Sequence, residues 1–311
     1  MNIYEETKMI MKRYNLDFKK KFGQNFLTSE EILEEIISKA KISKDDIILE
    51  IGPGIGTLTS KLLETGAEVI SVEVDLELIR PLKERFFMYN NFTIISSDIL
   101  KIDIYSEIVK ILESKGKTLN DKKIKVVANI PYYITTPIIF KLLESRNIVS
   151  EIYIMVQKEV AERICAKIGT KESSSITYMV SYYTEYLWDI YVDKTKFVPS
   201  PKVDSKVIAL KFREKPYPEV KNEELYFEII RSAFLHRRKT FLNSISASNK
   251  IDKKIISNIM EELGIDLRIR AEKITDKMYA DIVDKYIEKR RYNTCIINNI
   301  CSSIFNNCSE L

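Results

Sequence analysis

Short apolar runs alternate with longer amphipathic stretches from residue 47 onward. Five of these runs are rich in β-branched residues and occupy positions 47–51, 68–74, 92–96, 123–130 and 151–157. Strands separated by helices of this length indicate βαβ units and therefore a parallel sheet. Two further runs, 187–192 and 206–212, have no long helix between them. We expect them to complete a mostly parallel seven-stranded sheet as an antiparallel pair.

The pattern changes after Lys215-Pro-Tyr-Pro218, and helical periodicity dominates from about Glu223 to Lys289. This change predicts a domain boundary near residue 215, and the smaller domain that follows is expected to be all-α. The expected parts of the chain are an α/β domain at 1–215 with an N-terminal arm at 1–28, a helical domain at 216–290 and a tail at 291–311.

The composition is that of a globular chain, with 311 residues, 45% of them hydrophobic and 30% charged. This length suffices for one large domain and a smaller one. The 49 Lys and Arg residues nearly cancel the 45 Asp and Glu residues, which leaves a formal charge of +4. Any binding of a polyanion therefore requires a local arrangement of positive charge.

Histidine and cysteine usage narrows the possible chemistry. His236 is the single histidine, so His-rich metal sites are excluded and we predict no bound metal. Four cysteines without a CxxC pair favour a reducing cytoplasm. Three of them, Cys295, Cys301 and Cys308, lie in the Asn-rich tail. We expect that tail to be flexible, with a short amphipathic helix as the alternative.

Charged residues interrupt every Ile-rich stretch, so no run approaches the roughly 20 apolar residues that a membrane-spanning helix needs. The N-terminus carries Glu5, Glu6 and Asp17 and lacks the apolar core of a signal peptide. We therefore expect a cytoplasmic protein that does not bind a membrane.

Three of the eight glycines, Gly52, Gly54 and Gly56, directly follow the first predicted strand. Glycines at a strand-to-helix turn let the backbone approach a ligand closely. The motif reads E-x-G-x-G-x-G, and it differs from the G-x-G-x-x-G of dinucleotide enzymes and from the lysine-containing P-loop. It favours a ligand without phosphates, bound at the carboxyl edge of the sheet.

Acidic residues follow the next two strands. Glu73 stands at the end of the second strand, where a carboxylate can accept both hydroxyls of a ribose. Asp98 follows the third strand and can accept a proton from an adenine amino group. The spacing of these three features favours S-adenosylmethionine as the cofactor. The alternative is a structural turn with two solvated acids.

The segment Asn129-Ile-Pro131-Tyr132 follows the fourth strand. An exocyclic purine amine is a poor nucleophile, because its lone pair is delocalised into the ring. The Asn129 oxygen and a backbone carbonyl fixed by Pro131 could accept the protons of such an amine, while Tyr132 stacks on the base. This chemistry requires no histidine, thiolate or metal.

Two local clusters of positive charge are candidate RNA contacts. Five basic residues and one acid lie between Lys12 and Lys21, and four basic residues and no acid lie between Arg231 and Lys239. We expect the second cluster to lie on a helix whose apolar positions pack inward. A solvated basic face is the alternative. We expect His236 to be a surface or interfacial residue and not a catalytic base. The candidate RNA-binding residues are Lys19, Lys20, Lys21, Arg231, Arg237, Arg238 and Lys239.

Six segments together resemble the small-subunit ribosomal RNA adenine dimethyltransferases, the KsgA/RsmA family, over roughly residues 15 to 290. They are KFGQNFL at 21–27, EIGPG at 50–54, NIPY at 129–132, MVQKEVAER at 155–163, FVPSPKVDS at 197–205 and RRKT at 237–240. The resemblance implies a Rossmann-like S-adenosylmethionine-dependent methyltransferase domain. It also implies dimethylation of two adjacent adenosines near the 3′ end of small-subunit rRNA, during ribosome assembly.

The resemblance also implies roles for individual residues. At the cofactor it places Gln24, Asn25, Leu27, Gly52, Gly54, Glu73, Asp98 and Asn129. In catalysis it implies Asn129, Pro131, Tyr132 and Phe197, with Phe197 stacking on the flipped adenine opposite Tyr132. Core packing is the alternative for Phe197.

Some residues depart from the family pattern. Ile130 replaces the usual Leu, Tyr133 stands where Asn is common, and Ser97 replaces a Gly beside Asp98. The stretch 173–177 replaces Tyr-Gly-Arg-Leu-Ser, which leaves any contact there in doubt.

Other functions stay open at this point: a resistance-type methyltransferase acting on large-subunit rRNA, a non-catalytic assembly factor, and a small-molecule methyltransferase. We expect a monomer whose partner is the rRNA of an assembling small ribosomal subunit.

Overall fold

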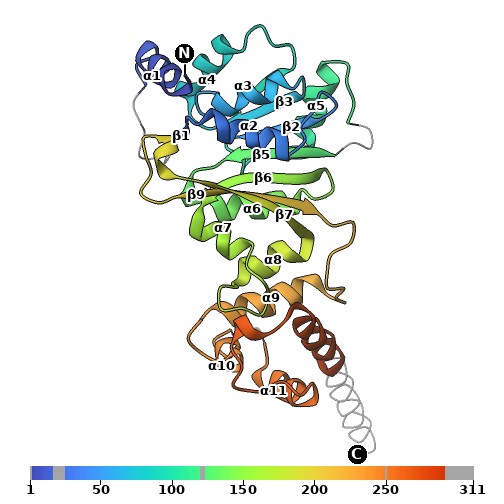
Figure 1. The fold of residues 1–311 in the computed structure, drawn as a ribbon. Coiled ribbons are helices and arrows are strands. Elements are labelled where there is room, and N and C mark those ends of the chain that lie inside the picture. The colour runs from blue at the N-terminus through green and yellow to red at the C-terminus, as the bar shows by residue number, and fades with distance from the viewer. Residues whose placement is uncertain (1, 17–24, 120–122, 249–250, 291–311) are drawn as a thin grey trace, which may run out of the picture. The chain divides into compact units, whose positions relative to one another are not determined.

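The computed structural model describes residues 2–16, 25–119, 123–248 and 251–290 (Figure 1). The chain divides into two compact units. The first comprises Met1–Glu162 and Tyr183–Glu214, and the second comprises Arg163–Tyr182 and Lys215–Leu311. This division differs from a single boundary near residue 215 in one respect, since residues 163–182 belong with the C-terminal helices.

A seven-stranded sheet forms the centre of the first unit. Its spatial order is β4-β3-β2-β5-β6-β9-β7. The strands are β2 (Ile47–Ile51), β3 (Glu68–Glu73), β4 (Phe92–Ser96), β5 (Ile124–Asn129), β6 (Val149–Gln157), β7 (Thr184–Val192) and β9 (Ser205–Phe212). The first five are parallel, and β9 pairs antiparallel with both β6 and β7. The predicted α/β class and strand directions are confirmed.

Central strands are buried on both faces, which is why they read as continuous apolar runs. Every residue of β2 and β3 is buried. Helices flank the sheet (Figure 1), and several begin at an acidic cap: Asp75 accepts from the Glu77 amide and Asp103 from the Ser106 amide. The helices of this unit are α1 (Ile3–Arg13), α2 (Glu30–Lys39), α3 (Thr57–Glu64), α4 (Leu76–Arg85), α5 (Ile104–Ser114) and α6 (Thr135–Glu144), with 3-10 turns η2 (Tyr132–Ile134) and η3 (Lys194–Lys196).

A second, two-stranded sheet joins distant parts of the first unit. Strand β1 (Phe26–Leu27) pairs antiparallel with β8 (Phe197–Val198), and Leu27 lies opposite Phe197. The apolar pattern did not predict this pair, because two-residue strands show no periodicity. It brings the chain before α2 beside the segment that precedes β9.

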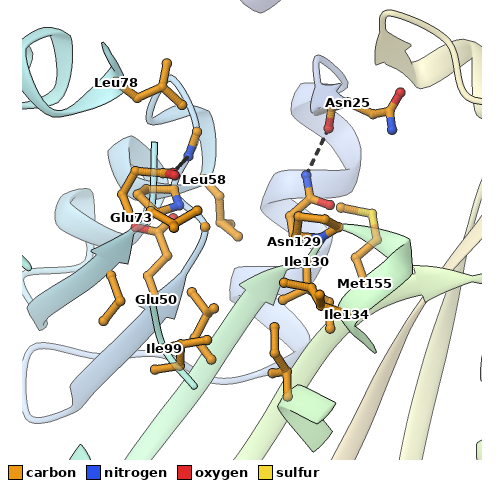
Figure 2. A pocket seen from close by; sticks show the side chains of 18 of the residues that line it. Asn25, Glu50, Leu58, Glu73, Leu78, Ile99, Asn129, Ile130, Ile134 and Met155 are labelled. Carbon is orange, nitrogen blue, oxygen red and sulfur yellow. Dashed lines mark hydrogen bonds between the residues drawn. The ribbon is translucent and has the colours of Figure 1, made fainter. Parts of the chain in front are cut away.

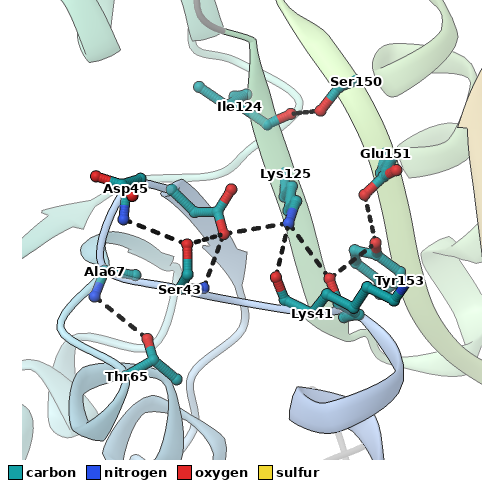
Figure 3. Close-up of polar contacts among 12 residues, drawn as sticks. Lys41, Ser43, Asp45, Thr65, Ala67, Ile124, Lys125, Ser150, Glu151 and Tyr153 are labelled. Carbon is teal, nitrogen blue, oxygen red and sulfur yellow. Dashed lines mark hydrogen bonds and ion pairs between the residues drawn. The ribbon is translucent and has the colours of Figure 1, made fainter.

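The amino edge of the sheet is held by contacts of a partly buried lysine (Figure 3). The Lys125 ammonium on β5 donates to the carbonyls of Ala40 and Lys41 at 3.3 and 3.2 Å, and it lies 3.1 Å from Asp46 Oδ2. These carbonyls end helix α2 and would otherwise lack partners in the helix. A cation at this position also complements the negative end of the helix dipole.

Aromatic packing explains why residues 163–182 join the second unit. Tyr178 is fully buried, its ring lies 5.1 Å from that of Tyr279, and its hydroxyl donates to the Ile274 carbonyl at 2.6 Å. Tyr182 packs on Tyr226 with ring centroids 5.2 Å apart. Helices of this part of the chain are α7 (Lys158–Ile164), which begins in the first unit, α8 (Ser175–Tyr183), α9 (Glu223–Phe234), α10 (Phe241–Ile245) and α11 (Lys253–Glu262), with η4 (Ala271–Lys273) and a helix at 276–290.

The prediction that the second basic cluster lies on a helix holds for Arg231, which is on α9, and is wrong for Arg237, Arg238 and Lys239. Helix α9 ends at Phe234, and residues 235–239 form turns before α10. The Lys239 amide donates to the His236 carbonyl, and the Thr240 side chain caps α10 by accepting from the Asn243 amide. The cap at Thr240 begins a new helix at that position. A continuous α-helix would give the three consecutive cations before it no stabilising side-chain pair.

We predict that Gly56→Ala destabilises the protein more than Gly116→Ala. Both glycines have positive φ, +87° and +66°. An added Cβ at Gly56 would lie 2.6 Å from the Phe86 ring, whereas nothing lies within 4 Å of one at Gly116. We expect losses in the free energy of unfolding of about 2 to 4 kcal/mol and about 1 kcal/mol, respectively. Urea unfolding of both variants measures this difference, and equal losses would contradict the packing argument.

Candidate active site

One pocket lies at the carboxyl ends of β2, β3, β4 and β5 (Figure 2). In an open α/β sheet this edge is where ligands bind. Most of the residues predicted from sequence line it: Asn25, Leu27, Gly52, Gly54, Glu73, Asp98, Asn129, Pro131 and Tyr132. Gln24 lies outside the described residues. All of these lining residues belong to the first compact unit.

The glycine turn forms one wall of the pocket. Gly52 and Gly54 have φ values of +70° and +61°. Residues with a Cβ rarely adopt this left-handed backbone region. A Cβ at Gly54 would lie 2.8 Å from the Phe26 ring, and one at Gly52 would lie 3.3 Å from the Asn129 carbonyl. The turn therefore combines a left-handed backbone with close packing, and only glycine satisfies both.

Glu73 ends β3 and faces the glycine turn. Its Oε2 accepts from the Gly54 amide at 3.2 Å, and its Oε1 accepts from the Asp75 amide at 2.8 Å. The side chain is only 5% exposed. Burial raises the pKa of Glu73 to about 7, although the two backbone amides favour the charged form. The carboxylate is thus held in place beside the glycine turn.

Glu50 is a second buried acid at the pocket, and sequence reasoning assigned it no role. Its Oε2 accepts from the hydroxyls of Thr59 and Ser71 at 2.7 and 2.6 Å. Its Oε1 is buried and has no hydrogen-bond partner among the described residues. Burial raises the pKa of Glu50 to about 7. The signal was present in the sequence, because Glu50 begins the E-x-G-x-G-x-G motif.

Asn129 ends β5 with its amide orientation fixed. Its Nδ2 donates to the Asn25 carbonyl at 3.2 Å, as Figure 2 shows. An amide that donates through nitrogen on one side presents its oxygen as an acceptor on the other. Asn25 directly precedes β1, so the β1–β8 pair contributes to the placement of this side chain.

Tyr132 and Tyr133 follow Pro131 in a 3-10 turn and both line the pocket. The Tyr132 ring is half-buried, and its hydroxyl lies 2.8 Å from Ser205 Oγ, which ties the ring to β9. Tyr133 is 61% exposed. A fixed ring and an exposed ring at the mouth of one pocket suit contact with a planar base.

Phe197 does not line the pocket. It is 3% exposed and belongs to the hydrophobic core with Phe26 and Leu27. The structure thus agrees with the core-packing alternative for this ring.

Asp98 follows β4 and lines the pocket with a half-buried side chain. Its Oδ1 accepts from the Leu100 amide at 3.0 Å, which orients the carboxylate. Ile99 and Met155 supply apolar surface to the pocket.

The residues present fit S-adenosylmethionine. The unpartnered Glu50 Oε1 and the buried Glu73 carboxylate are acceptors for a ligand that carries positive charge and hydroxyl donors, and the glycine turn leaves room for it. Within the described ranges, no group of three His, Cys, Asp or Glu side chains is arranged to hold a metal ion. The described helices include none long and apolar enough to cross a membrane.

The candidate RNA-binding residues fall into two groups. Lys19, Lys20 and Lys21 lie outside the described residues. Arg238 and Lys239 are exposed in the turn after α9. Arg237 is also exposed, and its Nη2 donates to the carbonyls of Lys171 and Ser173 at 3.2 and 3.3 Å. Arg231 lies 3.5 Å from Glu228. Arg237 therefore helps to hold the 171–173 loop within the second unit.

Solved structures share this architecture. A dimethyladenosine transferase from Plasmodium falciparum superposes with a TM-score of 0.68 and 28% identity, over 85% of this chain and 98% of that one. The 23S rRNA methyltransferase ErmE superposes with a TM-score of 0.62 and 23% identity, over 84% and 99% of the two chains. The second likeness shows a shared fold alone.

Sequence comparisons are more specific. A protein from Lactococcus lactis, named ribosomal RNA small subunit methyltransferase A, is 44% identical over 92% of this chain and 95% of its own length. A Clostridium botulinum protein of the same name is 45% identical over 89% of this chain and 97% of its own. The family model for ribosomal RNA adenine dimethylases matches residues 15–288. The chain belongs to the ribosomal RNA adenine dimethylase family.

Proposed function

We propose that this enzyme dimethylates two adjacent adenosines near the 3′ end of small-subunit rRNA, with S-adenosylmethionine as the methyl donor. The observation that carries the proposal is the convergence of the glycine turn, Glu73, Asp98 and the Asn129–Tyr132 segment on one pocket. Relatives 44 and 45% identical that are named small subunit methyltransferase A support the choice of substrate. The large-subunit alternative has weaker support, because ErmE is 23% identical.

The cofactor supplies an electrophilic methyl group, so the protein need only position and polarise the target amine. Asn129 Oδ1 accepts a hydrogen bond from that amine, and the hydrogen bond from its Nδ2 to the Asn25 carbonyl keeps the oxygen directed at the substrate. Tyr132 stacks on the adenine, and its hydrogen bond to Ser205 fixes the ring. Positioning of this kind acts without a histidine base.

The buried acids bind the cofactor in this proposal. Glu73 accepts the ribose hydroxyls, and the amides of Gly54 and Asp75 hold its carboxylate. Asp98 accepts from the adenine amino group. Glu50 Oε1 faces the positively charged methionine part, which would give it the partner that it lacks among the described residues.

The exposed cations of the turn after α9, Arg237 to Lys239, contact the phosphates of the rRNA in this proposal. We also propose that the enzyme acts as a cytoplasmic monomer. The cysteine spacing and an rRNA substrate support the compartment.

We predict that Asn129→Ala lowers the rate of methyl transfer at least about 100-fold, because it removes the acceptor of the amine proton. Affinity for S-adenosylmethionine should fall by no more than about tenfold. The assay uses labelled cofactor with undermethylated small subunits, and large subunits and free adenosine serve as substrate controls. Asn90→Ala, an exposed asparagine away from the pocket, should behave as wild type. Wild-type rates in Asn129→Ala would refute the mechanism.

We predict that cofactor affinity rises with pH through about 7, because the pKa of Glu73 lies there in the free protein and its charged form is the better acceptor. Glu73→Gln should bind the cofactor more weakly and show a smaller pH dependence. The slope that remains belongs to Glu50, whose pKa is also about 7, and Glu50→Gln tests it separately. Calorimetric titrations from pH 5.5 to 8.5 measure the affinity of each variant and of the wild type. Comparing the two removes the contribution of the ligand's own titration. Identical pH profiles would exclude Glu73.

We predict that replacing Arg237 and Arg238 together with Ala weakens binding to small subunits. The slope of log K against log salt should fall by roughly 1 to 2, since each phosphate contact contributes about 0.7 to 0.9. Arg238→Ala alone separates this effect from the contacts of Arg237 with the 171–173 loop. Arg268 and Arg270, exposed arginines of the same unit, provide the matched control pair. An unchanged salt slope in the Arg237 and Arg238 double variant would show that these two residues do not contact the rRNA.

A further inference from the structure

Helix α1 reaches the glycine turn through one buried arginine. Arg85, at the end of α4, donates from Nη1 to the Ile55 carbonyl at 2.8 Å and from Nη2 to Glu6 Oε1 at 2.6 Å. Its side chain is 18% exposed, and that of Glu6 on α1 is 34% exposed. Ile55 lies between Gly54 and Gly56 in the turn. These two contacts thus connect Glu6, Arg85 and the turn that lines the cofactor pocket.

The Ile55 carbonyl is a sensitive point of the turn. Its peptide plane joins Ile55 to Gly56, which has φ +87°, and it follows Gly54, which has φ +61° and lines the pocket. A charged donor on that carbonyl opposes rotation of the plane and so restricts the glycines to these values. The Gly54 amide, which donates to Glu73, is fixed by the same restriction.

The Glu6 carboxylate in turn keeps the guanidinium at the turn. Burial lowers the pKa of Arg85, and the charge of Glu6 opposes that shift. Ile3, Ile10 and Met11 of α1 pack against the core of the first unit, which fixes the distance from Glu6 to Arg85. The family model matches from residue 15, and α1 precedes the matched residues.

We propose that α1 is a positioning element for the cofactor site, acting through Glu6 and Arg85 on the Ile55 carbonyl. This inference rests on the proposed binding of S-adenosylmethionine in the pocket. Arg85 touches neither substrate nor cofactor in this proposal, and its effect is exerted on the conformation of the turn.

The test measures the Kd for S-adenosylmethionine by calorimetry and the free energy of unfolding by urea, in the full chain. Arg85→Met removes both hydrogen bonds and retains the apolar stem, and it should raise Kd about tenfold. Glu6→Ala, at a partly exposed position that folding tolerates, should raise Kd in the same direction but less. Arg80→Met is the matched control. Its ion pair with Glu84 lies on the same helix and does not contact the turn, so Kd should stay at the wild-type value.

A charge swap separates positioning from stability. The double variant Glu6→Arg with Arg85→Glu restores an ion pair between α1 and α4, but a carboxylate at position 85 cannot donate to the Ile55 carbonyl. We expect it to recover unfolding free energy relative to Glu6→Ala while Kd stays raised. A wild-type Kd in Glu6→Ala, or recovery of both Kd and stability in the swap, would overturn the inference. Failure of the wild type to bind the cofactor would instead refute the proposed function.

Discussion

The close approach of the glycine turn to the neighbouring strand ends is the constraint on which the site depends. A Cβ at Gly52 would lie 3.3 Å from the Asn129 carbonyl, and the Gly54 amide donates to Glu73. A turn with Cβ atoms would have to stand further from the ends of β5 and β3, which carry Asn129 and Glu73. Three glycines in five residues, from a chain that has eight, supply this approach.

The same enclosure gives the pocket its electrostatic character. Glu50 and Glu73 are both buried there, and burial raises the pKa of each to about 7. Near neutral pH the free protein therefore holds carboxylates that are only partly charged. A ligand with a positive charge and hydroxyl donors stabilises the charged forms of both acids, so binding offsets a desolvation penalty already present in the folded chain. A neutral or anionic ligand of the same size would lack this gain.

Sequence patterns predicted the elements whose signal is local. The apolar runs located all seven strands of the large sheet, and the residues at the ends of β2 to β5 were correctly expected at one edge, because parallel strands share that edge. The β1–β8 pair escaped prediction, since it joins residues about 170 positions apart through strands of two residues. The sequence pattern also did not predict that α8 belongs to the second unit. That depends on which aromatic rings Tyr178 contacts, and periodicity does not encode such contacts.

Two further side chains have contacts that residue types alone did not reveal. Phe197 was expected to stack on a base because an aromatic precedes a rigid proline segment, and the structure buries its ring in the core, opposite Leu27. Arg237 was expected to contact phosphate, and its guanidinium also donates to two backbone carbonyls. In both cases the deciding fact is a partner distant in sequence, and no local pattern reveals it.

These long-range contacts matter for the chemistry because the proposed reaction has no strong base. When rate comes from orientation, the groups that orient the acceptor are as important as the acceptor. The Asn129 amide depends on the Asn25 carbonyl, Asn25 is placed by β1, and β1 is held by its pairing with β8. The buried Phe197 ring lies in that pairing. The Phe197 ring therefore helps to hold Asn129 in place. This gives the 197–205 segment, which resembles the family, a structural role that requires no contact with a base.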